Sequence, residues 1–147
     1  FARNVLGIAD ADSGEFNRNC ANKVIDFLPD QSDSTDKGGT LRLGSYPCKT
    51  AEGSLLQNCY GEKLIHERHR HRYEFNNDYR RQMEAAGMVL SGTSPDNYIV
   101  EAVELPKNDF FIGVQYHPEF KSRPNKPAPL FVGLVKRRLN GKENKQK

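Results

Sequence analysis

The sequence predicts an α/β domain, because short segments with strand periodicity alternate with segments of helical periodicity along its 147 residues. Residues 110–114 form an apolar run with the length and composition of a buried strand. Residues 77–86 and 130–139 carry apolar side chains at helical spacing. A chain of this length is typical of a single domain.

The overall composition argues against several classes of protein. The net charge of +3, from 22 basic and 19 acidic residues, does not by itself indicate nucleic-acid binding. No apolar run approaches the roughly 18 residues of a membrane span, and no secretory signal opens the chain. The three cysteines are irregularly spaced without a C-x-x-C motif, which favours reduced thiols in a cytoplasmic protein over a zinc site or a disulfide framework.

The first residues have the pattern of a helix followed by a loop. Residues 1–6 place apolar side chains on one helical face with no capping residue before them, so we expect a helix that starts upstream and ends at Gly7. Residues 9–16 are rich in turn formers and contain Glu15. Taken alone, Glu15 is interpreted as a solvated loop carboxylate.

Four further segments predict strands. Residues 24–28 and 40–44 are short strands joined by a polar, glycine-ended loop at residues 30–39. Residues 88–90 and 98–105 are two more, the second with alternating side chains.

Two helices follow from capping and periodicity. Residues 77–86 begin with Asn77 or Asp78 as a cap and end before Gly87. Residues 130–139 carry an apolar face made of Leu130, Phe131, Leu134, Val135 and Leu139.

Residues 64–75 carry an unusual run of alternating arginine and histidine. In a strand, adjacent side chains leave on opposite faces. Arg68, Arg70 and Arg72 would then lie on one face, and the opposite face would carry His69, His71 and Tyr73. The arginines could contact phosphates, or one of them could bind a carboxylate through its planar guanidinium. A charged edge strand that resists aggregation is the structural alternative.

A histidine and a carboxylate follow the apolar run of residues 110–114. His117 and Glu119 are two positions apart, so in an extended backbone their side chains leave on the same face, and Pro118 favours that backbone. A histidine with a carboxylate beside it is what acyl transfer needs as base and orienting group. Such pairs also occur in surface turns, so the spacing alone leaves both interpretations open.

Several motifs together resemble the CTP synthase family, specifically the later part of its class I glutamine amidotransferase domain. They are residues 38–44 (GGTLRLG), 67–76 (ERHRHRYEFN), 113–124 (GVQYHPEFKSRP) and 127–131 (PAPLF). The H-P-E motif is similar to the wider glutaminase superfamily, whereas R-H-R-H-R-Y and H-P-E-F-x-S-R-P are similar to this family in particular. The resemblance extends from residue 1 to about residue 139.

The resemblance implies roles for four residues. His117 is similar to the general base that activates a cysteine thiol, and Glu119 to the carboxylate that orients it. Glu15 lies in D-S-G-E-F, similar to N-S-T-E-F, whose glutamate helps to bind glutamine; Gly14 stands where the family has threonine. Arg72 matches the arginine that binds glutamine. A guanidinium suits the α-carboxylate of glutamine and a carboxylate suits its α-ammonium.

The resemblance also implies the domain organisation. Residues 1–140 would be the later part of an α/β domain with a largely parallel central sheet flanked by helices, and residues 141–147 a polar, disordered tail. The site would lie at the carboxyl ends of strands. The nucleophilic cysteine of the family lies on a strand-to-helix elbow that would precede residue 1. None of the three cysteines lies in that context, so we expect the chain alone not to hydrolyse glutamine.

The implied activity is hydrolysis of L-glutamine to supply ammonia for the ATP-dependent amination of UTP to CTP. The fragment is expected to bind no cofactor and no metal. By resemblance, ATP, Mg²⁺ and UTP belong to an absent synthetase domain, and GTP acts as an activator. The resemblance also implies that the whole enzyme is a cytoplasmic homo-oligomer, a tetramer. We expect no nucleic-acid partner and no membrane partner.

Two alternatives remain open at this stage. The chain could belong to another class I glutamine amidotransferase or a stand-alone amidohydrolase, against which the R-H-R-H-R-Y motif argues. It could also be a non-enzymatic nucleic-acid-binding module that uses Arg68, Arg70 and Arg72, against which the modest net charge argues.

Overall fold

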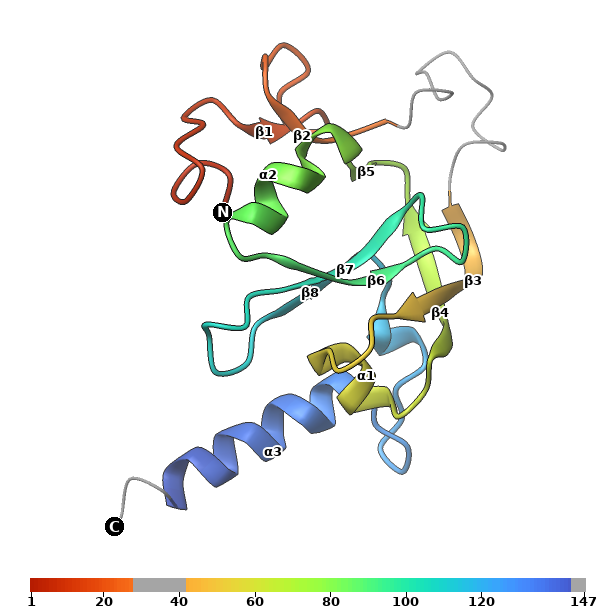
Figure 1. Cartoon of the computed structure of the whole chain (residues 1–147). Coiled ribbons are helices and arrows are strands. Elements are labelled where there is room, and N and C mark those ends of the chain that lie inside the picture. Colours follow the sequence, from red (N-terminus) through yellow and green to blue (C-terminus); the bar gives the residue numbers. More distant parts are fainter. Residues whose placement is uncertain (28–41, 144–147) are drawn as a thin grey trace.

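A computed structural model describes residues 1–27 and 42–143, and within them the strands form two sheets (Figure 1). The larger sheet has the order β4–β3–β6–β7–β8 and the smaller one the order β1–β2–β5. The larger sheet consists of β3 (Arg42–Thr50), β4 (Leu64–His71), β6 (Val89–Thr93), β7 (Val100–Glu104) and β8 (Ile112–Val114). The smaller one consists of β1 (Asp12–Ser13), β2 (Lys23–Asp26) and β5 (Glu74–Phe75).

The pairing of strands differs from the largely parallel sheet that we expected. Every neighbouring pair of the larger sheet is antiparallel, and among the strands of the described ranges only β1 and β2 pair in parallel. The connections explain this result. Residues 94–99 join β6 to β7, which is too short for the crossover of about a dozen residues that a parallel neighbour needs.

The most buried strand is β7, and not the apolar run of residues 110–114 as expected. β7 lies inside the sheet, and Val100 and Ala102 contribute to two separate apolar clusters. β8 spans only Ile112–Val114, is half-buried, and pairs within the described residues only with β7. Phe111 lies in the preceding hairpin, where its carbonyl accepts a hydrogen bond from the backbone N–H of Leu105. The aromatic half of the run therefore forms a hairpin connection and not a strand.

The alternation predicted for β4 is confirmed. Ile65, Glu67 and His69 are buried, whereas Arg68 and Arg70 are exposed. β4 is paired along its whole length with β3, which extends well beyond the strand expected at residues 40–44. The expected strand at residues 24–28 is β2, and residue 28, residues 40–41 and the loop at residues 30–39 lie outside the described ranges.

The predicted helix at residues 77–86 is present as two consecutive elements, η1 (Asn77–Tyr79) and α2 (Arg80–Ala85). The cap is one residue earlier than expected: the Asn76 side chain accepts a hydrogen bond from the backbone N–H of Asp78. Gly87 has a φ of +95° after the helix, as a glycine C-terminal residue allows.

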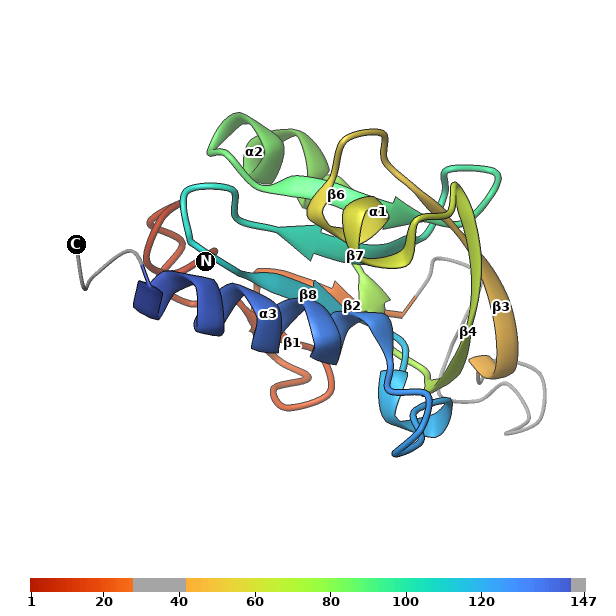
Figure 2. The same cartoon turned by 90° about the horizontal axis from the view of Figure 1, so that it is seen from below.

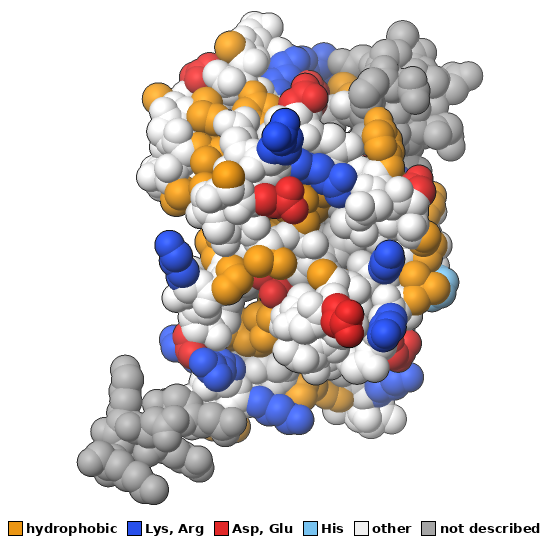
Figure 3. Space-filling model, in the orientation of Figure 1, with side chains coloured by type: hydrophobic (Ala, Val, Ile, Leu, Met, Phe, Trp, Pro, Cys, Tyr) orange, Lys and Arg blue, Asp and Glu red, His pale blue; other side chains and the backbone are white. Residues whose placement is uncertain are grey.

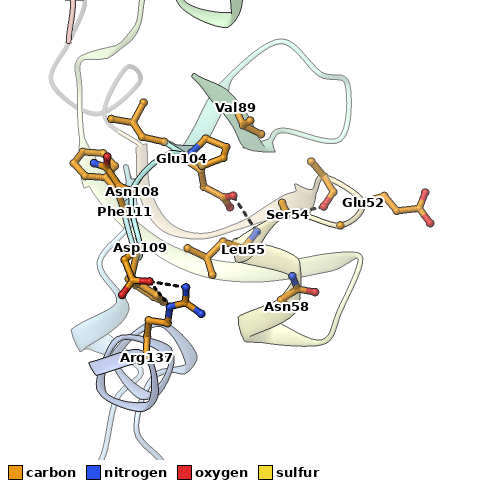
Figure 4. A pocket seen from close by; sticks show the side chains of 15 residues that line it. Glu52, Ser54, Leu55, Asn58, Val89, Glu104, Asn108, Asp109, Phe111 and Arg137 are labelled. Carbon is orange, nitrogen blue, oxygen red and sulfur yellow. Dashed lines mark hydrogen bonds and ion pairs between the residues drawn. The ribbon is translucent and has the colours of Figure 1, made fainter. Parts of the chain in front are cut away.

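A short helix that the sequence did not predict, α1 (Leu55–Tyr60), connects β3 to β4. Both carboxylate oxygens of Glu104 accept hydrogen bonds from the first backbone N–H groups of α1, one from Leu55 at 2.9 Å (Figure 4) and one from Leu56 at 2.7 Å. Glu104 and Leu55 line a hollow of about 490 Å³. Asp109 and Arg137 form an ion pair in the same hollow. The buried Glu104 therefore holds α1 onto β7.

The last helix, α3 (Pro129–Glu143), continues past residue 140, where we expected it to end. It packs against α1, and in the view from below it runs across β8 (Figure 2). Gly133 makes the close approach possible, because a Cβ atom there would lie 2.6 Å from Cys59 Sγ. Of the expected apolar face only Leu130 is buried; the others are exposed, namely Phe131, Leu134, Val135 and Leu139. Hydrophobic side chains also reach the surface between Lys and Arg in the view of Figure 3.

The first six residues form turns and not the expected helix. The Phe1 carbonyl accepts hydrogen bonds from the N–H groups of Val5, at 2.8 Å, and Leu6, at 3.4 Å, which amounts to a single turn. Gly7 follows with a φ of +73°. The turn packs on the cluster around Met83 and Met88, so tertiary contacts accompany this conformation.

Candidate active site

His117 and Glu119 form a hydrogen-bonded pair just beyond β8. His117 Nδ1 lies 2.8 Å from Glu119 Oε1. His117 has an extended backbone (φ −110°, ψ 90°), whereas Glu119 lies in the 3₁₀ turn η2 (Pro118–Phe120). The expected proximity is present, but it arises from this turn and not from a continuous strand. Pro118 occupies the first position of this turn, where the fixed φ of proline matches the helical backbone.

The pair faces solvent and has a defined polarity. The side chains of His117 and Glu119 are 35% and 55% exposed. The pKa of Glu119 is lowered, first by its own backbone N–H and then by His117. A carboxylate on Nδ1 favours the tautomer that carries its proton there, which leaves Nε2 free to accept a proton. The ring of Phe120 stacks on His117 with centroids 4.8 Å apart and fixes the ring plane further.

Glu15 lies in the loop after β1. Its side chain is exposed, and its backbone N–H lies 3.2 Å from Ser13 Oγ. It lines a hollow of about 360 Å³ together with Gly113 and Gln115, the last of which is two residues before His117. Gly14 is closely packed, because a Cβ atom would lie 2.7 Å from Asp26 Oδ1. The threonine of the family motif would therefore require Asp26 to move.

Arg72 directly follows β4 and is half-buried. No ion pair or side-chain hydrogen bond joins Arg72 to another residue of the described ranges. The link between β4 and the pair is a backbone one: the N–H of His117 donates to the carbonyl of Arg68 at 2.8 Å. In the part of the chain that the structure describes, no hydrogen bond or ion pair joins Glu15 or Arg72 to His117 or Glu119.

None of the three cysteines has the setting of a nucleophile. Cys48 lies within β3, and burial raises its pKa to about 12. Cys59 lies in α1, and burial raises its pKa as well. Cys20 lies in a loop. A strand-to-helix elbow surrounds none of them, and a thiol with a raised pKa is a poor nucleophile.

A second group of ionisable residues is largely buried, and sequence reasoning missed it as a unit. This interior charge cluster consists of Arg42, His69, His71, Glu74 and Glu101. Arg42 Nη2 lies 2.7 Å from Glu101 Oε1, and Arg42 Nη1 lies 3.7 Å from Glu74 Oε1. The alternation in β4 placed its histidines on the inner face, but nothing in the local sequence indicated that Arg42 and Glu101 would meet them.

Burial and hydrogen bonding favour the neutral forms of the two histidines in the interior charge cluster. His71 Nδ1 lies 3.1 Å from the carbonyl of Tyr73, so this nitrogen donates, and His71 Nε2 accepts from His69 Nδ1 at 2.8 Å. Burial, followed by the charge of Arg42, lowers the pKa of His69 to about 3 and that of His71 to about 4. Burial raises the pKa of Glu101, and raises that of Glu74 to about 8.

Within residues 1–27 and 42–143, no group of three or more His, Cys, Asp or Glu side chains could hold a metal ion. In the same part of the chain, no helix has the length and apolar character needed to cross a membrane.

A histidine–carboxylate pair at a strand end of an α/β domain is the arrangement of an acyl-transfer site, and comparison with known proteins identifies the class. The model of the family described as "Glutamine amidotransferase class-I" matches residues 9–137 of the chain. The chain belongs to this family.

Within this family, the chain is most informatively compared with two curated relatives and one solved structure, all of them CTP synthases by name. The chain is 57% identical over 145 residues to the CTP synthase of Staphylococcus saprophyticus and 58% identical to that of Staphylococcus aureus. In both cases the match covers 99% of this chain and 27% of the relative. A structure described as Trypanosoma brucei CTPS, glutaminase domain with bound acivicin, superposes with a TM-score of 0.83 at 36% identity, covering 92% of this chain and 53% of that one. The chain thus spans about a quarter of its curated relatives.

Proposed function

We propose that this chain acts as the later part of the glutaminase of a CTP synthase, in which L-glutamine is hydrolysed and the ammonia aminates UTP to CTP with ATP. The observation that carries the proposal is the pair of His117 and Glu119, with Nδ1 bound to the carboxylate and Nε2 available. The similarity to CTP synthases along 99% of the chain supports the substrate.

In the proposed reaction, His117 moves the proton at each step. A cysteine thiol from a part of the enzyme outside this chain gives its proton to His117 Nε2, and the thiolate sulfur attacks the amide carbon of glutamine. His117 then protonates the leaving nitrogen, ammonia departs and a thioester remains. Water attacks the thioester while His117 takes its proton and returns it to the sulfur, and glutamate leaves. Glu119 stabilises the imidazolium that forms twice in this cycle.

We propose Arg72 and Glu15 as the groups that bind the two ends of glutamine. The guanidinium of Arg72 would pair with the α-carboxylate, and Glu15 with the α-ammonium. The exposed Glu15 in its hollow and the absence of an ion pair for Arg72 among the described residues support this assignment. Both groups lie on connections that follow strands, β1 and β4.

The remaining assignments rest on the resemblance. We propose that ATP, Mg²⁺ and UTP bind to a part of the enzyme outside this chain, that GTP activates it, and that the enzyme is a cytoplasmic homotetramer. The three cysteines are free in the described structure, in agreement with a reducing compartment.

The decisive experiment compares two nitrogen sources in an enzyme that contains this chain together with the rest of a CTP synthase. His117→Ala should abolish CTP synthesis from glutamine and retain synthesis from free ammonia, since ammonia bypasses the glutaminase. Equal loss of both activities would contradict the proposal and indicate a structural role for His117.

The isolated chain provides a second test. Because its thiols do not lie in a nucleophile's setting, the purified 147-residue chain should release no ammonia from glutamine. Ammonia release that Cys20→Ser, Cys48→Ser or Cys59→Ser abolishes would show that one of them is the nucleophile after all.

A further inference from the structure

The turn that carries His117 and Glu119 is attached to three successive residues of β4. The backbone N–H of His117 donates to the carbonyl of Arg68 at 2.8 Å. Lys121 Nζ donates to the carbonyl of His66 at 2.5 Å and to Glu67 Oε1 at 3.2 Å. Lys121 is therefore the one side chain, among the described residues, that joins the turn to β4 by an ion pair.

The partner of this lysine is a buried carboxylate. The side chain of Glu67 is 4% exposed, and that of Lys121 is 48% exposed. A buried charge without a partner is strongly unfavourable, and Lys121 provides the only ion pair of Glu67 within the described structure. The interaction is therefore more than an ordinary surface salt bridge, because one partner cannot be solvated by water.

The position of Lys121, directly after the turn η2, links its contact with Glu67 to the geometry of His117 and Glu119. Lys121 directly follows η2, and its backbone N–H donates to the carbonyl of Pro118 at 3.2 Å. The turn is thus fixed at its start by the backbone of His117 and at its end by the ammonium of Lys121. Between these points lies Glu119, whose exposed carboxylate orients the His117 ring.

We infer that Lys121 is a positioning residue, which holds the 3₁₀ turn against Glu67 of β4 and so fixes the geometry between Glu119 and His117. The geometric part concerns this chain alone, whereas its catalytic consequence rests on the proposed function. Loss of the ammonium leaves the start of the turn bound to the Arg68 carbonyl and releases its end from β4, so the His117 ring samples orientations without its carboxylate.

The first test measures the His117 ring directly in the 147-residue chain, without any activity. In Lys121→Met, the ring-nitrogen NMR shifts of His117 should move from a protonated Nδ1 towards a mixture of tautomers. Lys121→Arg should retain the original shifts, since a guanidinium can also donate to a carbonyl and a carboxylate. Lys107→Met, at an exposed lysine on the β7–β8 connection, is the matched control and should match the unsubstituted chain.

A second variant is needed in case the Lys121→Met protein does not fold because Glu67 is buried without its ion-pair partner. Glu67→Gln combined with Lys121→Met removes the buried charge and the tether together. This folded double variant should show the same change in the His117 shifts. Unchanged shifts in either folded variant would overturn the inference.

The catalytic consequence is measured in an enzyme that contains the rest of a CTP synthase. Lys121→Met with Glu67→Gln should lower kcat for glutamine hydrolysis about tenfold with KM nearly unchanged, because a misplaced base affects the chemical step. Synthesis from ammonia should be unaffected. A raised KM at constant kcat would overturn the positioning role. If His117→Ala leaves glutamine hydrolysis intact, the proposed function fails, while the NMR result still decides the geometric inference.

Discussion

Two regions of the molecule combine histidine with carboxylate, and they differ in every other respect. The interior charge cluster is largely buried, and His69 has no exposed side-chain surface. His117 and Glu119 lie at the surface beyond an edge strand. In the first region burial opposes the charged forms of the histidines and lowers their pKa values, whereas the ring of His117 is open to solvent. The comparison teaches that a histidine beside a carboxylate indicates a catalytic base only where the ring can reach a substrate.

The largest expected effect lies in the interior charge cluster. Arg42→Met leaves Glu74 and Glu101 without their cation, and should lower the free energy of unfolding by about 3–5 kcal/mol. Urea denaturation checks this value, with Arg81→Met at an exposed position of α2 as the control. A loss no larger than that of the control would contradict the contrast between the regions.

Arg72 should show the opposite behaviour. In an enzyme containing the complete glutaminase, Arg72→Ala should raise KM for glutamine about tenfold to a hundredfold, the worth of a charged hydrogen bond, with little change in stability. Initial rates against glutamine concentration measure this effect, and Arg81→Ala serves as control. An unchanged KM would refute the proposed contact with the α-carboxylate.

The pH dependence of stability sharpens the comparison further. The pKa of His69 is lowered from 6.5 to about 3, so the unfolded chain binds a proton that the folded chain excludes. Its stabilisation is present above pH 6.5 and is lost as the pH falls towards 3, with a slope of up to about 1.4 kcal/mol per pH unit. Glu74 acts in the opposite sense, because its stabilisation is present below pH 4.5 and is lost as the pH rises through about 8.

Urea titrations between pH 7 and about 4 measure this slope, a range set by the two histidine pKa values. Stability should fall more steeply on acidification in the unsubstituted chain than in His69→Gln. His66→Gln, on the exposed face of the same strand, should retain the original slope. Identical slopes in all three proteins would show that His69 does not exclude the proton.

The smallest expected effect concerns the exposed pair. His117→Ala should change the free energy of unfolding by no more than about 0.5 kcal/mol, as at other surface positions, and Glu119→Ala should likewise have little effect on stability. His69→Ala should cost about 1–3 kcal/mol, because it leaves His71 Nε2 without its donor. Similar losses at His69 and His117, measured by urea denaturation, would remove the distinction between the regions.

Local features of the fold were predictable where a short segment carries its own signal. The alternation in β4 was visible because adjacent side chains of a strand face opposite ways. The helical segment after Asn76 was visible through its cap and Gly87. α1 was missed although it carries local signals: the Ser54 hydroxyl accepts from the N–H of Gln57 at its start, and Gly61 ends it with a φ of +72°. Its contact with Glu104 could not be predicted, because Glu104 is distant in sequence.

The candidate site divides in the same way. The contact between His117 and Glu119 could be predicted because only Pro118 separates them. The contact of Lys121 with β4 could not, since it joins residues more than fifty positions apart and neither segment carries a sign of the other. The proposed roles of Glu15 and Arg72 remain predictions from motif resemblance.

The sequence by itself determined the α/β class, the two faces of β4, the pairing of His117 with Glu119 and the settings of the cysteines. Only the tertiary structure decided that β8 pairs, within residues 1–27 and 42–143, with β7 alone, that the larger sheet described there is antiparallel, and that Arg42 meets Glu101 inside it. The physical reason is that side-chain periodicity depends on backbone geometry within a few residues. Strand order and buried charge pairs depend instead on which distant segments exclude water from one another.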